Sequence, residues 1–288
     1  MPMSSAAVLV DLLRGRRVVV LAGAGCSTES GIPDYRGPES SKRSRKPMQY
    51  QEFVRSDEAR ARYWARSAIG WPRIAAAVPN AAHVALARLE QAGIVRGIIT
   101  QNVDGLHHAA GSRRVIELHG SLAAVCCLQC GRRESRHDFQ HRLLTLNTGW
   151  ADWLAGARHG HQAAMNPDGD VELPPAAMAD FRVPACRGCG GLIKPDVVFF
   201  GENVPRARVD EAWHLLDEAD VLLVAGSTLT VYSGRRFVDR ACHRGMPVAV
   251  INIGPTRADG VAAIKLEARL GRILPFLAED LLAVASAR

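Results

Sequence analysis

Short, β-branched apolar segments bounded by glycine recur along this chain and alternate with stretches of helical spacing. These segments are Arg17–Ala22, Ile94–Thr100, Val197–Phe200, Val221–Ala225 and Val248–Ile253. A nearly continuous apolar segment of this length is typical of a strand buried on both faces, as in parallel sheets. The alternation therefore predicts an α/β fold with an open, doubly wound parallel sheet of the Rossmann type.

The stretches between these strands have apolar residues at helical spacing. The predicted helices are Asn80–Gln91, Val209–Ala219, Arg235–His243 and Leu270–Ala287, with residues 1–17 forming a further helix before the first strand. Pro275 must lie in the first turn of the last helix or break it, because proline has no backbone N–H. A transit peptide is the alternative interpretation of the N-terminal segment.

Two insertions interrupt the alternation and predict a second, smaller module. Residues 38–79 are interpreted as a loop followed by helices, whereas residues 126–191 contain two Cys-x-x-Cys pairs and several prolines. We expect residues 1–37, 80–125 and 192–288 to form the Rossmann-like domain, and the two insertions to form the smaller module.

Composition excludes several classes of protein. With 48% hydrophobic and 23% charged residues, the bulk of the 288-residue chain is expected to be globular. No apolar run approaches the roughly 20 residues that cross a bilayer, so we expect no membrane association.

The net charge of +7 permits acidic partners without indicating specific nucleic-acid recognition. Seven cysteines without a signal-peptide pattern favour a reducing compartment, the cytoplasm.

A glycine-rich turn directly follows the first strand. In Gly23-Ala24-Gly25-Cys26-Ser27-Thr28, glycines let the backbone approach a phosphate, and an ensuing helix N-terminus would favour its charge. Thr28 stands where the dinucleotide fingerprint requires a third small residue, and Ser41-Lys42-Arg43 stands where it requires an acid. A hydride-transferring dehydrogenase is therefore disfavoured, while a turn that only connects strand to helix stays open.

Four longer strings resemble the sirtuin family. Residues 23–37, GAGCSTESGIPDYRG, are similar to the sirtuin signature GAGxSxxSGIPDFRG, with Tyr35 in place of the usual Phe. TQNVDGLH at 100–107, ELHG at 117–120 and KPDVVFFGE at 194–202 resemble three further sirtuin motifs in the family's order. The resemblance covers most of the chain, and residues 50–71 look most like the class II branch, which includes a mitochondrial sirtuin of animals and many bacterial proteins.

The resemblance implies an NAD-dependent protein lysine deacetylase or deacylase. In this chemistry the acyl oxygen of an acyl-lysine attacks the nicotinamide ribose and nicotinamide leaves. His119 then takes a proton from a ribose hydroxyl, and hydrolysis yields free lysine and acyl-ADP-ribose. NAD is consumed as a co-substrate, and the partners are acylated-lysine proteins. An imidazole can act as a base at neutral pH, although a lone histidine after a strand is more often structural.

The resemblance also assigns residues to the site. It gives catalytic roles to His119, Asn102 and Asp104. It places NAD contacts at Gly23, Ala24, Gly25, Ser27, Thr28, Ile32, Pro33, Asp34, Tyr35, Arg36, Gln101, Asn102, Val103, Asp104, Gly226, Ser227, Thr228, Asn252, Ile253, Gly254 and Leu270. It places the substrate peptide at Val197 and Phe199. Asn102 as a turn former and Asp34 as a cap are the structural alternatives.

Two Cys-x-x-Cys pairs predict a structural zinc site. Cys127, Cys130, Cys186 and Cys189 provide four thiolates, the ligand set of a closed tetrahedral site. The 55 residues between the pairs (131–185) exceed the usual spacing of a zinc ribbon, and a redox dithiol is the alternative. The sirtuin resemblance supports zinc and favours Cys127 over Cys126 as the ligand. Cys26 and Cys242 are expected to be buried.

Tyr63 and Arg66 are three residues apart and so share a helix face. The spacing is similar to the Tyr-x-x-Arg of desuccinylase-type sirtuins, and arginine binds carboxylates bidentately. We therefore expect the enzyme to accept carboxylated or bulky acyl chains. A solvated helix face is the structural alternative, because Arg60 and Arg62 lie nearby.

Two alternative functions would use the same site. Protein mono-ADP-ribosylation is the main alternative, suggested by the class II branch. A binding module that senses NAD without turnover is the second, and the presence of His119, Asn102 and Asp104 argues against it.

Overall fold

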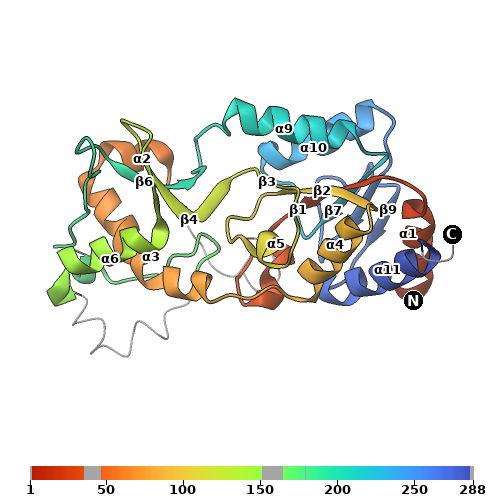
Figure 1. Cartoon of the computed structure of the whole chain (residues 1–288), viewed down its shortest axis with the longest axis horizontal. Helices are drawn as coiled ribbons and strands as arrows, with labels where there is room; N and C mark the ends of the chain where they lie inside the picture. The colour runs from red at the N-terminus through yellow and green to blue at the C-terminus, as the bar shows by residue number, and fades with distance from the viewer. Residues whose placement is uncertain (1, 36–46, 151–164, 179, 286–288) are drawn as a thin grey trace. The chain divides into compact units, whose positions relative to one another are not determined.

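The computed structural model describes residues 2–35, 47–150, 165–178 and 180–285 (Figure 1). The chain divides into two compact units. The first comprises Met1–Arg43, Val78–Leu118 and Val204–Arg288, and the second comprises Ser44–Ala77 and His119–Asn203. Both predicted insertions fall largely in the second unit, which also takes in the segments around His119 and Val197.

The first unit is built on a six-stranded parallel sheet. Its strands are β1 (Val18–Ala22), β2 (Val95–Thr100), β3 (Val115–Glu117), β7 (Val221–Ala225), β8 (Val248–Ile251) and β9 (Ile264–Leu266). Their order is β3-β2-β1-β7-β8-β9, so the chain winds outward in both directions from the pair β1–β7. This is the doubly wound order of the Rossmann fold, which confirms the predicted fold class.

Helices cover both faces of this sheet (Figure 1). They are α1 (Pro2–Leu13), α4 (Ala81–Gln91), α5 (Leu106–Ala109), α9 (Arg206–Asp217), α10 (Tyr232–His243) and α11 (Leu270–Ala285). One apolar core joins α1, α4 and α11 to one face, and a second joins α9 and α10 to the other. Val18 and Val20 enter the first core and Val19 and Leu21 the second, which explains why β1 is apolar throughout.

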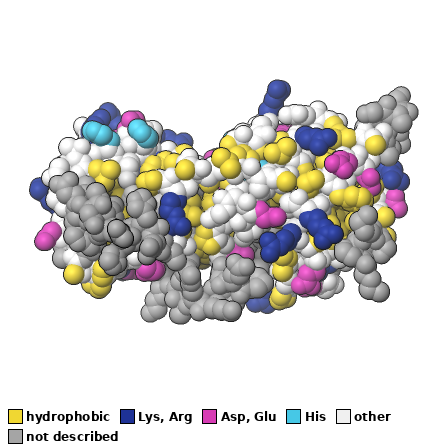
Figure 2. Space-filling view, turned by 90° about the horizontal axis from the view of Figure 1, so that it is seen from below, with side chains coloured by type: hydrophobic (Ala, Val, Ile, Leu, Met, Phe, Trp, Pro, Cys, Tyr) yellow, Lys and Arg dark blue, Asp and Glu magenta, His cyan; other side chains and the backbone are white. Residues whose placement is uncertain are grey.

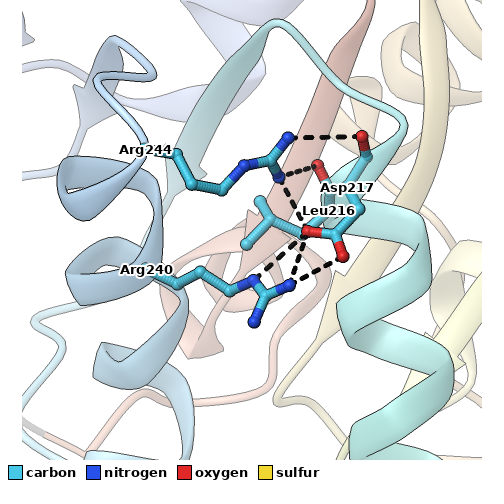
Figure 3. Close-up of polar contacts among 4 residues, drawn as sticks. All are labelled: Leu216, Asp217, Arg240 and Arg244. Carbon is cyan, nitrogen blue, oxygen red and sulfur yellow. Dashed lines mark hydrogen bonds and ion pairs between the residues drawn. The ribbon is translucent and has the colours of Figure 1, made fainter.

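An arginine pair joins α9 to α10 (Figure 3). Arg240 and Arg244 both bind the carboxylate of Asp217, the last residue of α9, at 2.7 Å. Arg244 also approaches the carbonyl oxygen of Leu216 at 3.4 Å, and Arg240 lies 5.0 Å from the ring centre of Trp213. The cations offset an acid at a helix C-terminus, where a negative charge is otherwise unfavourable.

The second unit combines a small antiparallel sheet with helices. Its strands are β4 (Gly120–Cys127), β5 (Arg133–Ser135) and β6 (Ile193–Val197), in the order β5-β4-β6. Its helices are α2 (Tyr50–Arg55), α3 (Asp57–Ala75), α6 (Arg136–Leu146) and the short 3-10 helix η3 (Pro175–Met178). Ser56 and Ser135 accept the N-cap hydrogen bonds of α3 and α6.

The predicted strand Val197–Phe200 was wrong in both place and partner. The strand is Ile193–Val197, and it pairs antiparallel with β4 instead of joining the parallel sheet. A short apolar run cannot reveal which sheet it enters. The three-residue strands β3 and β9 were not predicted, because such short segments carry no detectable periodicity.

The helix prediction holds for Asn80–Gln91, with Asn80 as N-cap of α4. The helices predicted at Val209–Ala219 and Arg235–His243 are also present, but α9 begins three residues earlier and ends at Asp217, and α10 begins three residues earlier. The expectation for Pro275 was wrong. Helix α11 begins at Leu270 and continues through Pro275, its sixth residue. Leu274 and Leu277 on either side are fully buried, so their packing outweighs the hydrogen bond that proline cannot donate.

Among the described residues on the face drawn in Figure 2, basic side chains lie interspersed with acidic and apolar ones. No helix of the described segments is long and apolar enough to cross a membrane.

Candidate active site

The glycine-rich turn lies at the point where the strand order reverses. Gly23 N donates to Ala225 O and Gly25 N donates to Gly226 O, both at 2.9 Å, so the turns after β1 and β7 are bonded together. A Cβ on Gly23 would lie 2.7 Å from Gly226 O, and one on Gly25 would lie 2.8 Å from Gly226 Cα. The glycines thus permit close packing of two turns at the crevice where open α/β sheets bind ligands.

The turn does not continue into an α-helix, which corrects that expectation. Two single-turn 3-10 helices follow β1, η1 (Ala24–Cys26) and η2 (Thr28–Ser30), and Gly31 ends them with a φ of +82°. Asn80 at the start of α4 donates to Cys26 O at 2.8 Å and to Ser30 Oγ at 3.0 Å. Residues 24–30 are therefore held in place by Asn80 of α4. Because only short 3-10 helices follow the glycine-rich turn, the dipole of a long helix does not favour an anion there.

We expect Gly226→Ala to destabilise the first unit strongly. Gly226 has a φ of +65°, and its Cβ would lie 2.6 Å from Cys26 N, so the substitution adds overlap to backbone strain. Gly245 has the same φ, but a Cβ added there would have no atom within 4 Å. Gly245→Ala is therefore the matched control. Urea unfolding should show a loss of about 1 kcal/mol for the control and about 2–5 kcal/mol for Gly226→Ala. Equal losses would mean that the two turns are not closely packed.

A buried polar network joins the turns after β1 and β2. Ser27 Oγ donates to Asp104 Oδ2 at 2.7 Å, and Asn102 Nδ2 donates to Ser27 Oγ at 3.0 Å and to Gly23 O at 3.1 Å. Leu106 N donates to the other oxygen of Asp104 at 2.9 Å. Ser27 and Asn102 are both buried, so this network fixes the orientation of the Asn102 amide and of the Asp104 carboxylate.

Gln101 connects the turns after β1, β2 and β7. Its Nε2 donates to Ser227 Oγ at 2.9 Å and to Ala22 O at 3.3 Å. A Cβ on Gly234 of α10 would overlap the Gln101 side chain, so glycine is required beside it. The structure thus brings together Gly23, Gly25, Ser27, Gln101, Asn102, Asp104, Gly226 and Ser227, all of which the sequence assigned to the NAD site.

A cavity of about 550 Å³ lies beside the turns after β7 and β8. Its lining consists of Thr228, Thr230, Ile253, Gly254, Pro255, Thr256 and Arg257. Asn252 is buried and shapes the turn by donating to the carbonyl oxygens of Ile253 and Gly254. The volume lies within the range of small-molecule pockets. The sequence assigned Thr228, Ile253 and Gly254 to NAD and gave no role to Thr230 or to Pro255–Arg257, which line the same cavity.

The remaining predicted NAD contacts of the first unit are spread around these turns. Leu270 is buried at the start of α11, where Gly271 N donates to Glu29 Oε2 at 2.7 Å. Ile32 is buried and Tyr35 is exposed. Arg36 and the basic residues 42–45 lie outside the described residues.

His119 is the first residue of the second unit and follows the β3 end of the parallel sheet directly in the chain. Its carbonyl oxygen accepts from Val198 N at 2.8 Å. Gly120 has a φ of +83°, and a Cβ there would overlap the carbonyl oxygen of Asp196. The glycine after the histidine is therefore needed to seat β4 against β6, which fixes the backbone of His119.

A buried lysine shapes the segment after β6. Lys194 is 3% exposed, and its Nζ bonds Val197 O and, at 3.1 Å, Glu202 Oε2. The same carboxylate accepts from Phe199 N at 2.9 Å. Lys194 thus holds the predicted peptide-binding residues Val197 and Phe199 in place. Sequence reasoning did not single out Lys194, although it stands first in the string KPDVVFFGE.

Tyr63 packs into an aromatic cluster that includes Phe199. Its ring centre lies 5.2 Å from those of Phe199 and Trp64 and 5.6 Å from that of Phe53. Tyr63 is 3% exposed, and burial raises the pKa of its hydroxyl well above the usual range. The structure therefore packs Tyr63 against Phe199, which the sequence also assigned to the substrate.

Arg66 is bound to acidic residues of the second insertion. Its Nη2 lies 3.0 Å from Asp170 Oδ2 and 2.6 Å from Glu172 Oε1, and its Nε donates to Val171 O at 2.9 Å. The guanidinium that the sequence offers to an acidic acyl chain is thus already paired with two carboxylates of the protein.

Asp170 makes stability depend on pH. Burial raises the pKa of its carboxyl from 3.8 to about 6, and the nearby Arg66 opposes this only partly. The folded state therefore holds this proton more tightly than the unfolded state, so the free energy of unfolding falls as the pH rises through this window. We expect wild type to lose about 1 kcal/mol relative to Asp170→Asn between about pH 5 and about pH 7.5 in urea unfolding. A difference that does not change with pH would contradict this prediction.

The four predicted zinc ligands meet in the second unit. The Sγ atoms of Cys127, Cys130, Cys186 and Cys189 all lie within 4.8 Å of one another. The contacts Cys127–Cys189 and Cys130–Cys186 measure 3.5 and 3.7 Å. A tetrahedral zinc with bonds of about 2.3 Å places its sulfurs about 3.8 Å apart, so the cluster fits a structural zinc ion.

Backbone N–H groups favour the thiolate form of Cys127 and Cys186 in this cluster. Those of Gln129 and Cys130 point at Cys127 Sγ, from 3.4 and 3.5 Å, and that of Gly188 points at Cys186 Sγ from 3.4 Å. These contacts lower the pKa of Cys127 to about 6, the Cys130 N–H contributing most. Zinc binds the thiolate form, so the donors suit a metal.

The other cysteines are not part of this cluster. Cys126 is not among its members, and burial raises the pKa of its thiol. Cys26 is buried as expected, whereas Cys242 is exposed on α10, which corrects that expectation.

Comparison with known proteins agrees with this geometry. A sequence profile of the Sir2 family matches residues 23–233. The chain is 50% identical to an NAD-dependent protein deacetylase of Xanthomonas campestris pv. campestris (strain 8004), over 96% of this chain and 92% of that protein. It is 48% identical to NAD-dependent protein deacetylase 2 of Bradyrhizobium diazoefficiens, over 96% of this chain and 98% of that protein.

Solved structures give the same result. A structure described as "Structural Basis for the Mechanism and Regulation of Sir2 Enzymes" matches with a TM-score of 0.76 and 31% identity, covering 98% of this chain and 99% of that one. A Sir2 structure with a deacetylated p53 peptide and 3'-O-acetyl ADP-ribose matches with a TM-score of 0.74 and 30% identity, covering 97% and 98%. The chain therefore belongs to the Sir2 family.

Proposed function

We propose that this protein is an NAD-dependent protein lysine deacetylase that transfers the acyl group to ADP-ribose and releases nicotinamide. The observation that carries the proposal is the buried network of Ser27, Asn102 and Asp104 at the switch point between β1 and β7. Relatives of about 50% identity are named NAD-dependent protein deacetylases and match nearly the whole chain. Acylated proteins are accordingly the proposed partners.

His119 is the proposed general base. It takes the proton from a ribose hydroxyl after the acyl oxygen has displaced nicotinamide, which lets that hydroxyl oxygen attack the acyl carbon. Water then adds at this carbon and the lysine amine leaves, which yields free lysine and acyl-ADP-ribose. Asn102 and Asp104 hold nicotinamide, ribose or water, and Gln101 holds ribose. Asp34 and Arg36 act beside nicotinamide and phosphate. The hydrogen bonds that fix Asn102 and Gln101 support these roles, because a preorganised amide need not reorient during reaction.

Cys127, Cys130, Cys186 and Cys189 are the residues that would hold zinc. The ion would supply structure, because four thiolates leave no open coordination position. Membership of the class II branch stays a prediction from residues 50–71, and a cytoplasmic location stays a prediction from cysteine usage.

The products distinguish this function from its alternatives. Mass spectrometry of a reaction with NAD and an acetyl-lysine peptide should show deacetylated peptide and acetyl-ADP-ribose. ADP-ribose attached to protein instead would support mono-ADP-ribosylation, and unchanged NAD with measurable binding would support a sensor. Absorbance from reduced nicotinamide would indicate a dehydrogenase, which the position of Thr28 disfavours.

A further inference from the structure

Residues 166–172 of the second insertion, which we call the acidic turn, fold tightly on themselves. Asn166 N donates to Asp170 O at 2.8 Å, and Gly169 N donates to Asn166 O at 2.9 Å. The side chain of Asn166 also donates to Asp170 Oδ1 at 2.6 Å and to Glu172 Oε1 at 3.1 Å. Both carboxylates are therefore held in one orientation by the turn itself.

The acidic turn is packed against α3. A Cβ on Gly70 of α3 would overlap the carbonyl oxygen of Gly169, so only glycine lets the helix and the turn approach this closely. Val171 is completely buried, and Asp170 is 7% exposed. The turn therefore forms part of the second unit's packed interior, next to the helix that carries Tyr63 and Arg66.

Arg66 is fully engaged by this turn. It contacts the carboxylates of Asp170 and Glu172 and the carbonyl oxygen of Val171, and its side chain is only 17% exposed. A carboxylated ligand could bind Arg66 only by displacing these groups. Displacement would leave the Asp170 carboxylate buried without a cation, which is strongly unfavourable.

Two other cations beside the aromatic cluster are engaged as well. Lys194 lies 4.7 Å from the ring centre of Phe199 and bonds Val197 O and Glu202. Arg136 lies 5.4 Å from the ring centre of Trp64, and its guanidinium donates to Gln140 at 2.6 Å and to Ser67 O at 3.2 Å. Arg66, Lys194 and Arg136 therefore all have hydrogen-bonding or acidic partners within the protein.

The buried carboxylate of Asp170 costs stability. Burial raises the pKa of its carboxyl to about 6, which shows that Arg66 does not fully offset the loss of water. Buried ion pairs of this kind are weak contributors to stability, so stabilisation alone does not account for the pairing of Asp170 with Arg66.

We propose that Asp170 and Glu172 determine acyl specificity by occupying Arg66, so that the enzyme removes uncharged acyl groups and discriminates against carboxylated ones. This inference rests on the proposed deacylase function. It reverses the preference that the Tyr63–Arg66 spacing suggests on its own, because the spacing does not reveal what the arginine binds.

The test compares acetyl- and glutaryl-lysine peptides of one sequence. Wild type should have a kcat/KM on the acetyl peptide at least about tenfold above that on the glutaryl peptide. Asp170→Asn/Glu172→Gln should raise kcat/KM on the glutaryl peptide about tenfold or more and leave the acetyl value within about twofold. Adding Arg66→Ala to this double variant should abolish the gain, because the freed guanidinium is its cause.

Glu58→Gln/Asp180→Asn is the matched control, since it removes two exposed acids of the same unit without touching Arg66. A similar gain in the control would overturn the inference in favour of a general charge effect. If the double variant does not fold, Glu172→Gln alone, at a carboxylate that is 65% exposed, should still give a smaller gain.

The outcomes separate this inference from the proposed function. The inference is overturned if the enzyme acts on the acetyl peptide but no variant gains activity on the glutaryl peptide. It is also overturned if wild type prefers the glutaryl peptide. Either result leaves the deacylase function standing. Inactivity of wild type on every acyl peptide overturns both.

Discussion

Replacement of Cys127 by alanine is expected to remove the bound zinc and unfold the second unit. The four sulfurs of its cluster lie within 4.8 Å of one another and connect the start of the second insertion to its end. Structural zinc contributes about 10–16 kcal/mol of binding free energy in zinc-finger peptides, which is comparable with the roughly 5–15 kcal/mol that stabilise a whole domain. Atomic absorption measures the zinc content per chain, and the thermal unfolding curve measures the loss of stability, in Cys127→Ala and in wild type.

The neighbouring Cys126→Ala provides the control. Cys126 stands one position earlier on β4 but is not a member of the cluster. This variant should keep one zinc per chain and unfold within a few degrees of wild type. Zinc retained by Cys127→Ala, or lost equally by both variants, would show that the predicted ligand set is wrong.

Replacement of His119 by alanine is expected to lower kcat by about 10²–10⁴ while NAD binding persists. The backbone of His119 is fixed by Val198 N and by the packing of Gly120, so the substitution should remove the imidazole without moving β4. Initial rates on an acetyl-lysine peptide, together with calorimetric titration of NAD, separate the loss of a base from the loss of the site.

His141→Ala serves as the control for this variant. His141 is an exposed histidine on α6 of the same unit, and its removal should leave kcat within about twofold. A His119→Ala enzyme with wild-type kcat would exclude His119 as the base. Loss of NAD affinity in proportion to activity would assign it a binding role instead.

Much of the first unit could be predicted from its residues. Strands such as Val18–Ala22 are apolar at every position because both faces are covered, and this pattern is visible without a structure. Asn80 marked the start of α4 because its side chain caps the helix. The cysteine pairs were visible because two intervening residues suit a metal-binding turn.

The remaining features depend on contacts between distant residues. The sequence shows that Tyr63 and Arg66 share a helix face, but not that Asp170, about a hundred positions later, binds Arg66. It shows glycines at 23 and 25, but not that Gly226 lies against them. The segment after β6 was misplaced because its apolar residues fit either sheet, and only pairing with β4 decides between them.

The central claim is that NAD is cleaved for transfer of an acyl group, and the most direct test is nicotinamide release from NAD with and without an acetyl-lysine peptide. We predict release that requires the acetylated peptide, matches the deacetylated product one to one, and disappears in His119→Ala. Release at the same rate without peptide, or no release from a zinc-loaded enzyme that binds NAD, would contradict the claim.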